Sequence, residues 1–235
     1  MIPGESPIYA RLRDLLPAAV RRYVLHFEAQ IDDAVEQFAS TLPARARVLD
    51  AGAGEAQYKQ HFSAHRYCGF DLAIGDAAWD YSRINVRGDL ADMPFRDATF
   101  DACLSIVTLE HVREPMRVVQ EMSRALGPGG RLLLVAPLEW EVHQAPHDFF
   151  RYTRHGLEYL LHEAGFEAIE IRPVGGFFRL LSRRVFNAIQ FFPGPLAIVA
   201  AIFLAPAGLV LPLFDGLDRQ RDFTLGYICF ARKGN

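Results

Sequence analysis

Hydrophobic positions recur along this chain with two different periods, and the change of period predicts where helices end and strands begin. Between residues 7 and 41, large apolar side chains recur at steps of three and four, which predicts helices ahead of the first strand. These are Leu12, Leu15, Leu16, Val20, Val24, Phe27, Ile31, Val35 and Phe38. From about residue 45, short and continuous apolar runs take over, as expected for strands of a sheet that is covered on both faces.

The apolar runs alternate with helical patterns, which predicts an α/β fold. Strands are expected to end at Asp50, at Asp71 and near Asp89, and over 100–107, 131–136 and 167–173. Helical spacing of Val118, Val119, Met122 and Leu126 predicts a helix that the run Gly127-Pro128-Gly129-Gly130 stops, and a second helix is expected over 153–164. An alternating segment, 224–232, predicts a last strand.

The stretch RVLDAGAGEAQYKQHFSAHRYCGFD, residues 47–71, carries the strongest functional signal. A strand ends at Asp50, a turn with Gly52 and Gly54 follows, and after a helix the second strand ends at Asp71. In an open parallel sheet a ligand lies at the carboxyl ends of the strands, and glycines let the backbone approach it closely. A carboxylate at the second strand end can accept hydrogen bonds from both ribose hydroxyls. The unit therefore predicts a nucleoside-like ligand.

The glycine loop favours a cationic ligand over a pyrophosphate. A dinucleotide-binding loop would carry a third glycine and hold a pyrophosphate on a helix N-terminus. Here Glu55 and Ala56 follow the second glycine, and an acid at that place repels a pyrophosphate. The order D-x-G-x-G at residues 50–54 resembles motif I of the class I S-adenosylmethionine-dependent methyltransferases. An ordinary glycine turn without a ligand is the alternative.

Residues 88–137, GDLADMPFRDATFDACLSIVTLEHVREPMRVVQEMSRALGPGGRLLLVAP, extend this resemblance. Their LPF-like, FD, LEHV and L-x-P-G-G signatures are similar to those of the methyltransferase type 11 group, and the resemblance covers about 45–175. It implies S-adenosylmethionine as the cofactor. The residues that it implies for the cofactor, from the methionine end through the ribose to the adenine, are Asp50, Gly52, Gly54, Asp71, Leu72, Asp89 and Leu90.

The resemblance also implies the fold class: a Rossmann-like, seven-stranded, mostly parallel sheet with an antiparallel last strand, in an α/β/α sandwich. We expect three parts on this basis. Residues 1–44 would form a helical cap, 45–176 with 222–235 the methyltransferase core, and 177–221 a hydrophobic insertion. Residues 72–83 are short and polar for a crossover helix, and a loop that carries Trp79 and Tyr81 towards the adenosine is the alternative.

Two places offer a base, which methyl transfer needs only when the acceptor must lose a proton. Glu110 and His111 follow the fourth strand directly, and His111 is the better candidate because a histidine ordinarily titrates near neutral pH. The segment HQAPHDFFRYT, residues 143–153, follows the fifth strand, and a similar segment occurs in a branch of the type 11 group. We predict His147 as a second catalytic candidate, and His143, Asp148, Arg151 and Tyr152 as acceptor-binding residues.

Structural roles for the same residues stay open. Asp148 would then pair with Arg151 or Arg154, and Thr153 would cap the following helix. Spacing alone also allows a metal site at His143, His147 and Asp148, but no further ligand motif accompanies it, so no metal is predicted.

The insertion between the sixth and last strands is unusually apolar. From Val185 to Phe214 there are 30 residues without a charge, and Leu196–Phe214 alone is close to a membrane-spanning length. Both ends of the insertion join the same sheet, and two crossings would need about 40 apolar residues, which argues against a span. Prolines are also expected to interrupt a straight helix here. An interfacial membrane hairpin with flanking arginines, a substrate lid and a homodimer contact remain as alternatives.

Composition narrows the possible partners of the protein and its cellular compartment. The net charge of −3 and the absence of a basic, aromatic-rich stretch argue against nucleic acid as a partner. Three cysteines, all within apolar strand-like runs, favour a reducing cytoplasm, with peripheral contact at the inner membrane face as an option. The predicted function is methyl transfer to a small or lipid-linked acceptor (EC 2.1.1.-). The alternatives are a non-catalytic, membrane-associated binding module and, less favoured because no Tyr-x-x-x-Lys pair is present, a nucleotide-binding oxidoreductase.

Overall fold

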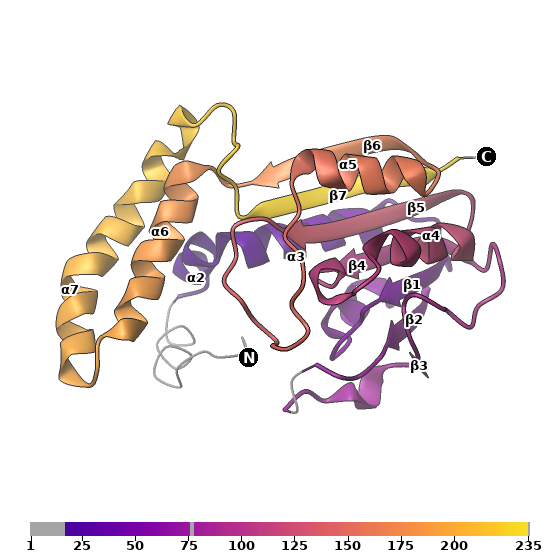
Figure 1. The fold of residues 1–235 in the computed structure, drawn as a ribbon, viewed down its shortest axis with the longest axis horizontal. Coiled ribbons are helices and arrows are strands. Elements are labelled where there is room, and N and C mark those ends of the chain that lie inside the picture. Colours follow the sequence, from indigo (N-terminus) through magenta and orange to yellow (C-terminus); the bar gives the residue numbers. More distant parts are fainter. Residues whose placement is uncertain (1–16, 76–77, 235) are drawn as a thin grey trace. The chain divides into compact units, whose positions relative to one another are not determined.

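A computed structural model describes residues 17–75 and 78–234 of the protein. Seven strands form one sheet in the order β3-β2-β1-β4-β5-β7-β6. The strands are β1 Arg47–Ala51, β2 Arg66–Asp71, β3 Val86–Arg87, β4 Phe100–Ile106, β5 Leu126–Pro137, β6 Phe166–Val174 and β7 Gly226–Lys233. Neighbours from β3 to β5 pair in parallel, whereas β7 runs antiparallel to β6 beside it (Figure 1). The predicted fold class is confirmed.

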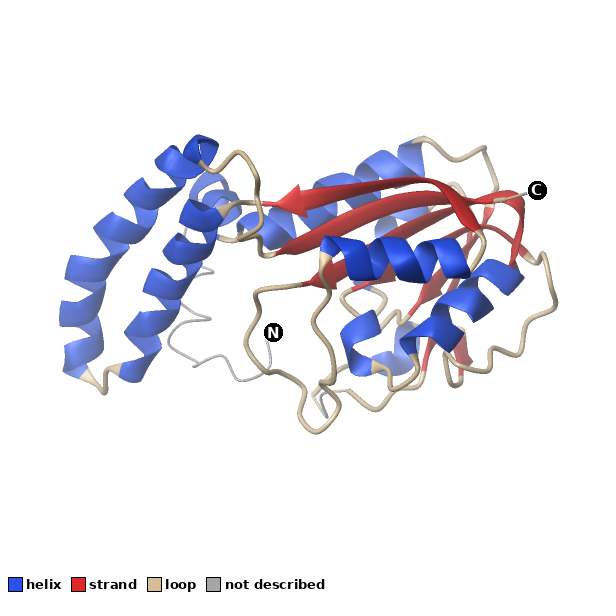
Figure 2. Cartoon of the chain, turned by 45° about the horizontal axis from the view of Figure 1, so that its top comes forward, coloured by secondary structure: helices blue, strands red, loops and turns tan. Residues whose placement is uncertain are grey.

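Helices connect the strands and also precede the first of them (Figure 2). The α-helices are α2 Ala18–Val24, α3 His26–Ser40, α4 Pro115–Ala125, α5 Arg154–Glu163, α6 Phe177–Ala188 and α7 Pro195–Val210. Short 3₁₀ helices are η1 Gln57–Phe62, η2 Tyr81–Arg83, η3 Leu109–His111, η4 Ile189–Phe191 and η5 Leu211–Leu217. The N-terminal helical prediction is confirmed from Ala18 onwards, with a break at Leu25, while Leu12, Leu15 and Leu16 lie outside the described residues.

The chain forms two compact units. The larger unit contains residues 31–138, 144–172 and the C-terminal strand, and the smaller one contains described residues up to 30 together with 139–143 and 173–226. The predicted division at 44, 176 and 221 stays a prediction.

The core of the larger unit is built on both faces of the sheet. On one face, Val118 and Met122 of α4 and Leu157 of α5 are fully buried with Leu132 and Leu134 of β5. Because side chains alternate along a strand, Leu133 and Val135 point to the opposite face, where α3 lies (Figure 1). The buried side chains that α3 supplies to the larger unit are Ile31, Ala34, Val35, Phe38 and Ala39. A sheet buried on both faces explains the continuous apolar runs.

Three local predictions need correction. The helix expected after the glycine loop is only the 3₁₀ turn η1, which follows Ala56 in a left-handed conformation. The strand expected at 131 begins five residues earlier, and the register shift between Phe100 and Ala102 accommodates the glycine-rich segment. Pro206 lies inside α7 without ending it, because a proline removes one hydrogen bond but neighbouring turns still hold the helix.

In the smaller unit, α6 and α7 lie side by side as an antiparallel hairpin (Figures 1 and 2). The Ser182 hydroxyl donates to the Gly208 carbonyl at 2.6 Å. A Cβ at Gly208 would lie 2.7 Å from the Phe186 ring, so glycine is needed for this close approach. The run Pro195–Leu217 is long and apolar enough to cross a membrane by length and composition.

Candidate functional site

The glycine loop after β1 is held by backbone bonds to the neighbouring strand. The Gly52 and Ala53 amides both donate to the Phe70 carbonyl, at 2.8 and 3.1 Å. Gly52 has φ +89°, and a Cβ there would lie 2.2 Å from the Thr108 side chain at the end of β4. Glycine at 52 is therefore required by the packing of Thr108, and its role in the close approach of a ligand stays a prediction.

Asp71 organises the same loop from the end of β2. One carboxylate oxygen accepts a 2.9 Å bond from the Gly54 amide, and the other accepts a 2.6 Å bond from the Ala73 amide. A carboxylate offers about four acceptor positions, so two remain for a ligand. The next residue, Leu72, is 45% exposed. Asp71 thus fixes the glycine loop and still presents acceptors at the carboxyl edge of the sheet.

Asp50 lies deeper than Asp71. It is 1% exposed and accepts a 2.5 Å hydrogen bond from the Tyr67 hydroxyl of β2. Burial raises the pKa of Asp50 to about 7, the negative charge of Asp71 adds to the shift, and the Tyr67 bond opposes it. The structure therefore places Asp50 beneath the loop, bonded within the protein.

The described residues between β2 and the short helix η2 form a loop, and this loop brings an aromatic side chain to the glycine loop. The ring of Trp79 would lie 3.4 Å from a Cβ at Gly54. The Glu55 carboxylate accepts a 3.0 Å bond from the Asp80 amide, which ties the two loops together. Trp79 and Tyr81 have ring centroids 6.0 Å apart. The loop alternative for residues 72–83 is confirmed for the described residues, while contact of its aromatic rings with adenosine stays a prediction.

Asp89 and Leu90 follow β3 but differ in exposure. The Asp89 carboxylate accepts a 2.9 Å bond from the Ala91 amide in an exposed turn. Leu90 is buried in the core of the larger unit. Asp89 is therefore the member of this pair whose side chain is open to a ligand, and the assignment of both to adenine stays a prediction.

A second cluster lies after β4, around η3. The Nδ1 atom of His111 is 2.5 Å from the His147 carbonyl oxygen, so it donates the hydrogen bond and leaves Nε2 as the acceptor nitrogen of a neutral ring. His111 is 12% exposed, and its Nε2 lies 3.7 Å from a carboxyl oxygen of Glu110, which is fully buried. Burial raises the pKa of Glu110 to about 8, partly offset by a backbone hydrogen bond and Arg151.

The loop over 144–153 folds onto η3 through its backbone. The Phe149 and Phe150 amides donate to the Glu110 carbonyl at 2.9 and 3.3 Å. The Tyr152 hydroxyl donates to the Leu109 carbonyl at 2.8 Å, and burial raises the pKa of Tyr152. The predicted residues His111, His147 and Tyr152 are thus brought together by these bonds.

The polar side chains of this loop fit the structural roles that the sequence left open. Asp148 forms a two-point ion pair with Arg151, at 2.6 and 2.9 Å. Thr153 caps α5 by accepting a 3.1 Å bond from the Gly156 amide. His143 belongs to the smaller unit, where its Nδ1 lies 3.0 Å from the Glu141 carbonyl. Roles for these residues in acceptor binding remain predictions.

Asp50, the glycine loop and Asp71 form a first cluster, and sequence reasoning missed two residues that shape it. Tyr67 supplies the bond that holds Asp50, and Thr108 fills the space left by Gly52. Tyr67 faces Val48 in the β1–β2 register, and only this pairing brings it to Asp50. Neither residue belongs to a motif, so the contact could not be found from spacing along the chain.

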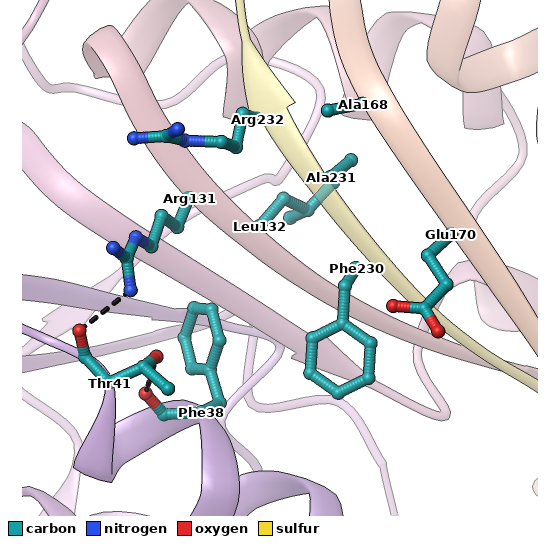
Figure 3. Close-up of a pocket in the computed structure, with 9 residues that line it drawn as sticks. All are labelled: Phe38, Thr41, Arg131, Leu132, Ala168, Glu170, Phe230, Ala231 and Arg232. Atoms are coloured by element: carbon teal, nitrogen blue, oxygen red, sulfur yellow. Dashed lines mark hydrogen bonds between the residues drawn. The ribbon is translucent and has the colours of Figure 1, made fainter.

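A cavity of about 250 Å³ lies elsewhere in the larger unit, between the end of α3 and strands β5, β6 and β7 (Figure 3). Arg131 at its edge donates a 2.7 Å bond to the Thr41 carbonyl just past α3. None of the predicted site residues lines this cavity. The residues that line it are Phe38, Thr41, Arg131, Leu132, Ala168, Glu170, Phe230, Ala231 and Arg232.

Comparison with known families shows the family of the segment that contains the glycine loop. A family model described as a methyltransferase domain matches residues 49–134, which run from β1 to β5 and include the glycine loop, Asp71 and His111. Residues 49–134 form a class I, S-adenosylmethionine-dependent methyltransferase domain of the type 11 group. The family resemblance stated from the sequence is confirmed.

Related proteins match the methyltransferase domain in part. The chain is 30% identical over 122 residues to a malonyl-[acyl-carrier protein] O-methyltransferase of Erwinia pyrifoliae, which covers 49% of this chain and 47% of that protein. An uncharacterized methyltransferase of a Mycobacterium species is 33% identical over 113 residues, or 45% of this chain and 44% of that protein. The chain thus spans about half the length of the relatives it matches.

Solved structures share the fold at low identity. The [4+2]-cyclase SpnF has a TM-score of 0.58 at 21% identity, covering 87% of this chain and 81% of its own. A phosphoethanolamine N-methyltransferase of Haemonchus contortus, solved in complex with S-adenosyl-L-methionine, has a TM-score of 0.58 at 14% identity and covers 99% of this chain and 61% of its own. These likenesses place the methyltransferase domain in its fold, and the fold hosts more than one chemistry.

Proposed function

We propose that this protein binds S-adenosylmethionine at the first cluster and transfers its methyl group to a small or lipid-linked acceptor. The observation that carries the proposal is Asp71, which fixes the Gly54 amide and keeps acceptor positions at the carboxyl edge of the sheet. The family match over 49–134 supports the same cofactor. Malonyl-[acyl-carrier protein] methylation by a relative is consistent with a carrier-linked acceptor.

The residues of the first cluster fit this cofactor. Asp71 would hold the ribose hydroxyls, and the loop of Gly52 and Gly54 would surround the methionine part with backbone groups. When bound, S-adenosylmethionine supplies an electrophilic methyl group on a sulfonium. Carboxylates at Glu55 and Asp71 favour a cationic ligand and disfavour a pyrophosphate. Trp79, beside Gly54, offers an aromatic face for either a base or a cation.

His111 is the base that the geometry favours. Its Nδ1–H is committed to the His147 carbonyl, so Nε2 carries the lone pair that can take a proton from an acceptor. The His147 contribution passes through its backbone, which leaves the His147 ring the weaker candidate. Asp148, Arg151, Tyr152 and His143 are proposed for acceptor binding, as the sequence predicted.

We place this activity in the cytoplasm. Three free cysteines, two of them buried, suit a reducing compartment. The acidic overall balance gives no support for a nucleic-acid acceptor.

Calorimetric titration tests the proposal. We expect S-adenosylmethionine and S-adenosylhomocysteine to bind with one site per chain, and reduced nicotinamide dinucleotide to give no heat. Binding of the nicotinamide compound alone would support the oxidoreductase alternative and overturn the proposal. Mass spectrometry of small molecules and lipids that co-purify with the protein would identify the acceptor.

A further inference from the structure

Helix α7 is apolar around its whole circumference, yet it is barely covered by protein. No charged or polar side chain occurs in the sequence PLAIVAAIFLAPAGLV of α7. Within Pro195–Leu217, only 17% of the most apolar stretch is buried. A helix that is apolar all round belongs either in a protein core or in lipid. The large apolar side chains exposed here are Phe191, Phe192, Leu196, Ile198, Val199, Ile202, Phe203, Leu209, Val210, Leu213, Phe214 and Leu217.

Contacts within the hairpin show which of these side chains lie nearest its tip. Ser182 bonds to Gly208, and Phe186 packs against the same glycine, so residues 182–186 of α6 lie level with Gly208 of α7. Residues 186–206, which we call the hairpin tip, therefore begin at that level and extend away from it. Leu217 lies on the other side of it, nine residues after Gly208 and at the end of η5.

Arginines mark the inner limit of the hairpin tip. Arg183 and Arg184 precede it on α6, and they form ion pairs with Glu28 and Glu141 at distances of 3.0–3.3 Å. The guanidinium of Arg183 also lies 3.5 Å from the ring centre of Trp140. Charged side chains do not enter hydrocarbon readily, even when paired. These pairs also occupy arginines that the sequence had suggested for anionic headgroups.

We propose that the hairpin tip inserts into one leaflet of a lipid bilayer, to a depth set by Arg183 and Arg184. Residues 195–206 of α7 rise about 17 Å along the helix at 1.5 Å per residue. One leaflet of hydrocarbon is about 15 Å thick, half of the full core. The 21 residues of the hairpin tip are too few for two crossings, which need about 40. The tip thus matches one leaflet in length and composition.

Lipid suits this surface better than a second copy of the chain. Exposed apolar side chains at 196, 198, 199, 202 and 203 cover a wide arc of α7, whereas a helix–helix contact would cover one stripe. Because Arg183 and Arg184 are already paired, apolar burial drives the insertion. We therefore expect similar binding to vesicles of phosphatidylcholine alone and to vesicles that also contain phosphatidylglycerol, with little dependence on salt.

Vesicle flotation of the full chain tests whether the hairpin tip contacts lipid and how deeply it inserts. Phe203 in the hairpin tip and Leu217 outside it are 75% and 70% exposed, so glutamate at either leaves the protein core unchanged. We expect Phe203→Glu to reduce flotation at least tenfold and Leu217→Glu to keep it near the wild-type level. Equal loss of flotation in both variants would overturn the proposed insertion depth. Flotation of Phe203→Glu at the wild-type level would overturn the proposed contact of the hairpin tip with lipid.

Two further measurements separate this inference from its rivals. S-adenosylmethionine binding by Phe203→Glu should equal that of the wild type, because the insertion is independent of the proposed methyl transfer. Flotation without cofactor binding would overturn only the proposed function. A wild-type dimer in sedimentation that Phe203→Glu dissociates, with no flotation by the wild type, would overturn the lipid inference in favour of a second copy.

Discussion

Two clusters lie at the carboxyl edge of the sheet, one after β1 and β2 and one after β4, and they use carboxylates in opposite ways. Asp71 accepts bonds from two backbone amides and stays partly open to solvent. Glu110 is fully buried, and burial raises its pKa to about 8, so it is largely protonated at neutral pH. The first cluster is organised around a carboxylate that is partly open to solvent, and the second is organised by backbone bonds around a neutral acid and His111.

This contrast predicts that His111 affects turnover and leaves cofactor binding intact. His111→Ala should lower kcat by about 10² to 10⁴-fold on an acceptor that loses a proton, because the base is removed. S-adenosylmethionine affinity should not change. Release of S-adenosylhomocysteine with the identified acceptor, followed against pH, is the measurement. His147→Ala is the matched control, since the backbone carbonyl that holds His111 remains; a greater loss there would assign the base to His147 instead.

Replacement of Asp71, in contrast, should change the affinity for the cofactor. Asp71→Ala is expected to weaken S-adenosylmethionine binding by about 10- to 100-fold, because it removes charge-assisted bonds of about 1.5–3 kcal/mol and frees the Gly54 amide. Asp71→Asn, which keeps one acceptor oxygen, should lose less. Asp101→Ala, at the start of β4, serves as the control in the same titration. Unchanged affinity in Asp71→Ala would show that the ribose is held elsewhere.

The fold could be predicted almost entirely from the sequence because its signals are local. Continuous apolar runs marked β4 and most of β5, and Gly127–Gly130 correctly placed the end of α4. What failed depended on tertiary contacts. The register shift that lengthens β5 and the persistence of α7 through Pro206 are decided by neighbouring strands and turns, which no residue spacing reports.

The two clusters differed in how far the sequence could describe them. Asp71 and the glycine loop form a motif whose backbone geometry follows from residue order, and both lie where expected. The second cluster depends on pairing between distant segments, such as the Phe149 amide with the Glu110 carbonyl. Burial of Glu110 is likewise a property of the folded chain. The sequence suggests both His111 and His147 as bases. Only the structure shows that His147 meets the ring of His111 through its backbone carbonyl and not through its own ring.

The smallest expected effect concerns Glu110, and it is a change in the free energy of unfolding rather than in activity. The pKa of Glu110 is raised from 4.5 to about 8, so between these values the folded chain holds a proton that the unfolded chain has released. The free energy of unfolding should therefore fall as pH rises through this window, by up to about 1.4 kcal/mol per pH unit, and level off above pH 8.

Glu110→Gln keeps a neutral side chain and should remove this fall. Asp50, whose pKa is raised to about 7, contributes a decline of its own that Glu110→Gln keeps, so the difference between the wild type and this variant from pH 7 to 8 reports Glu110. Urea unfolding at pH 7.0 and 8.0 gives the comparison, with Glu114→Gln on an exposed side chain as the control. If the wild type and Glu110→Gln lose stability equally over this interval, Glu110 is ionised in the folded protein, and the two clusters do not differ in charge.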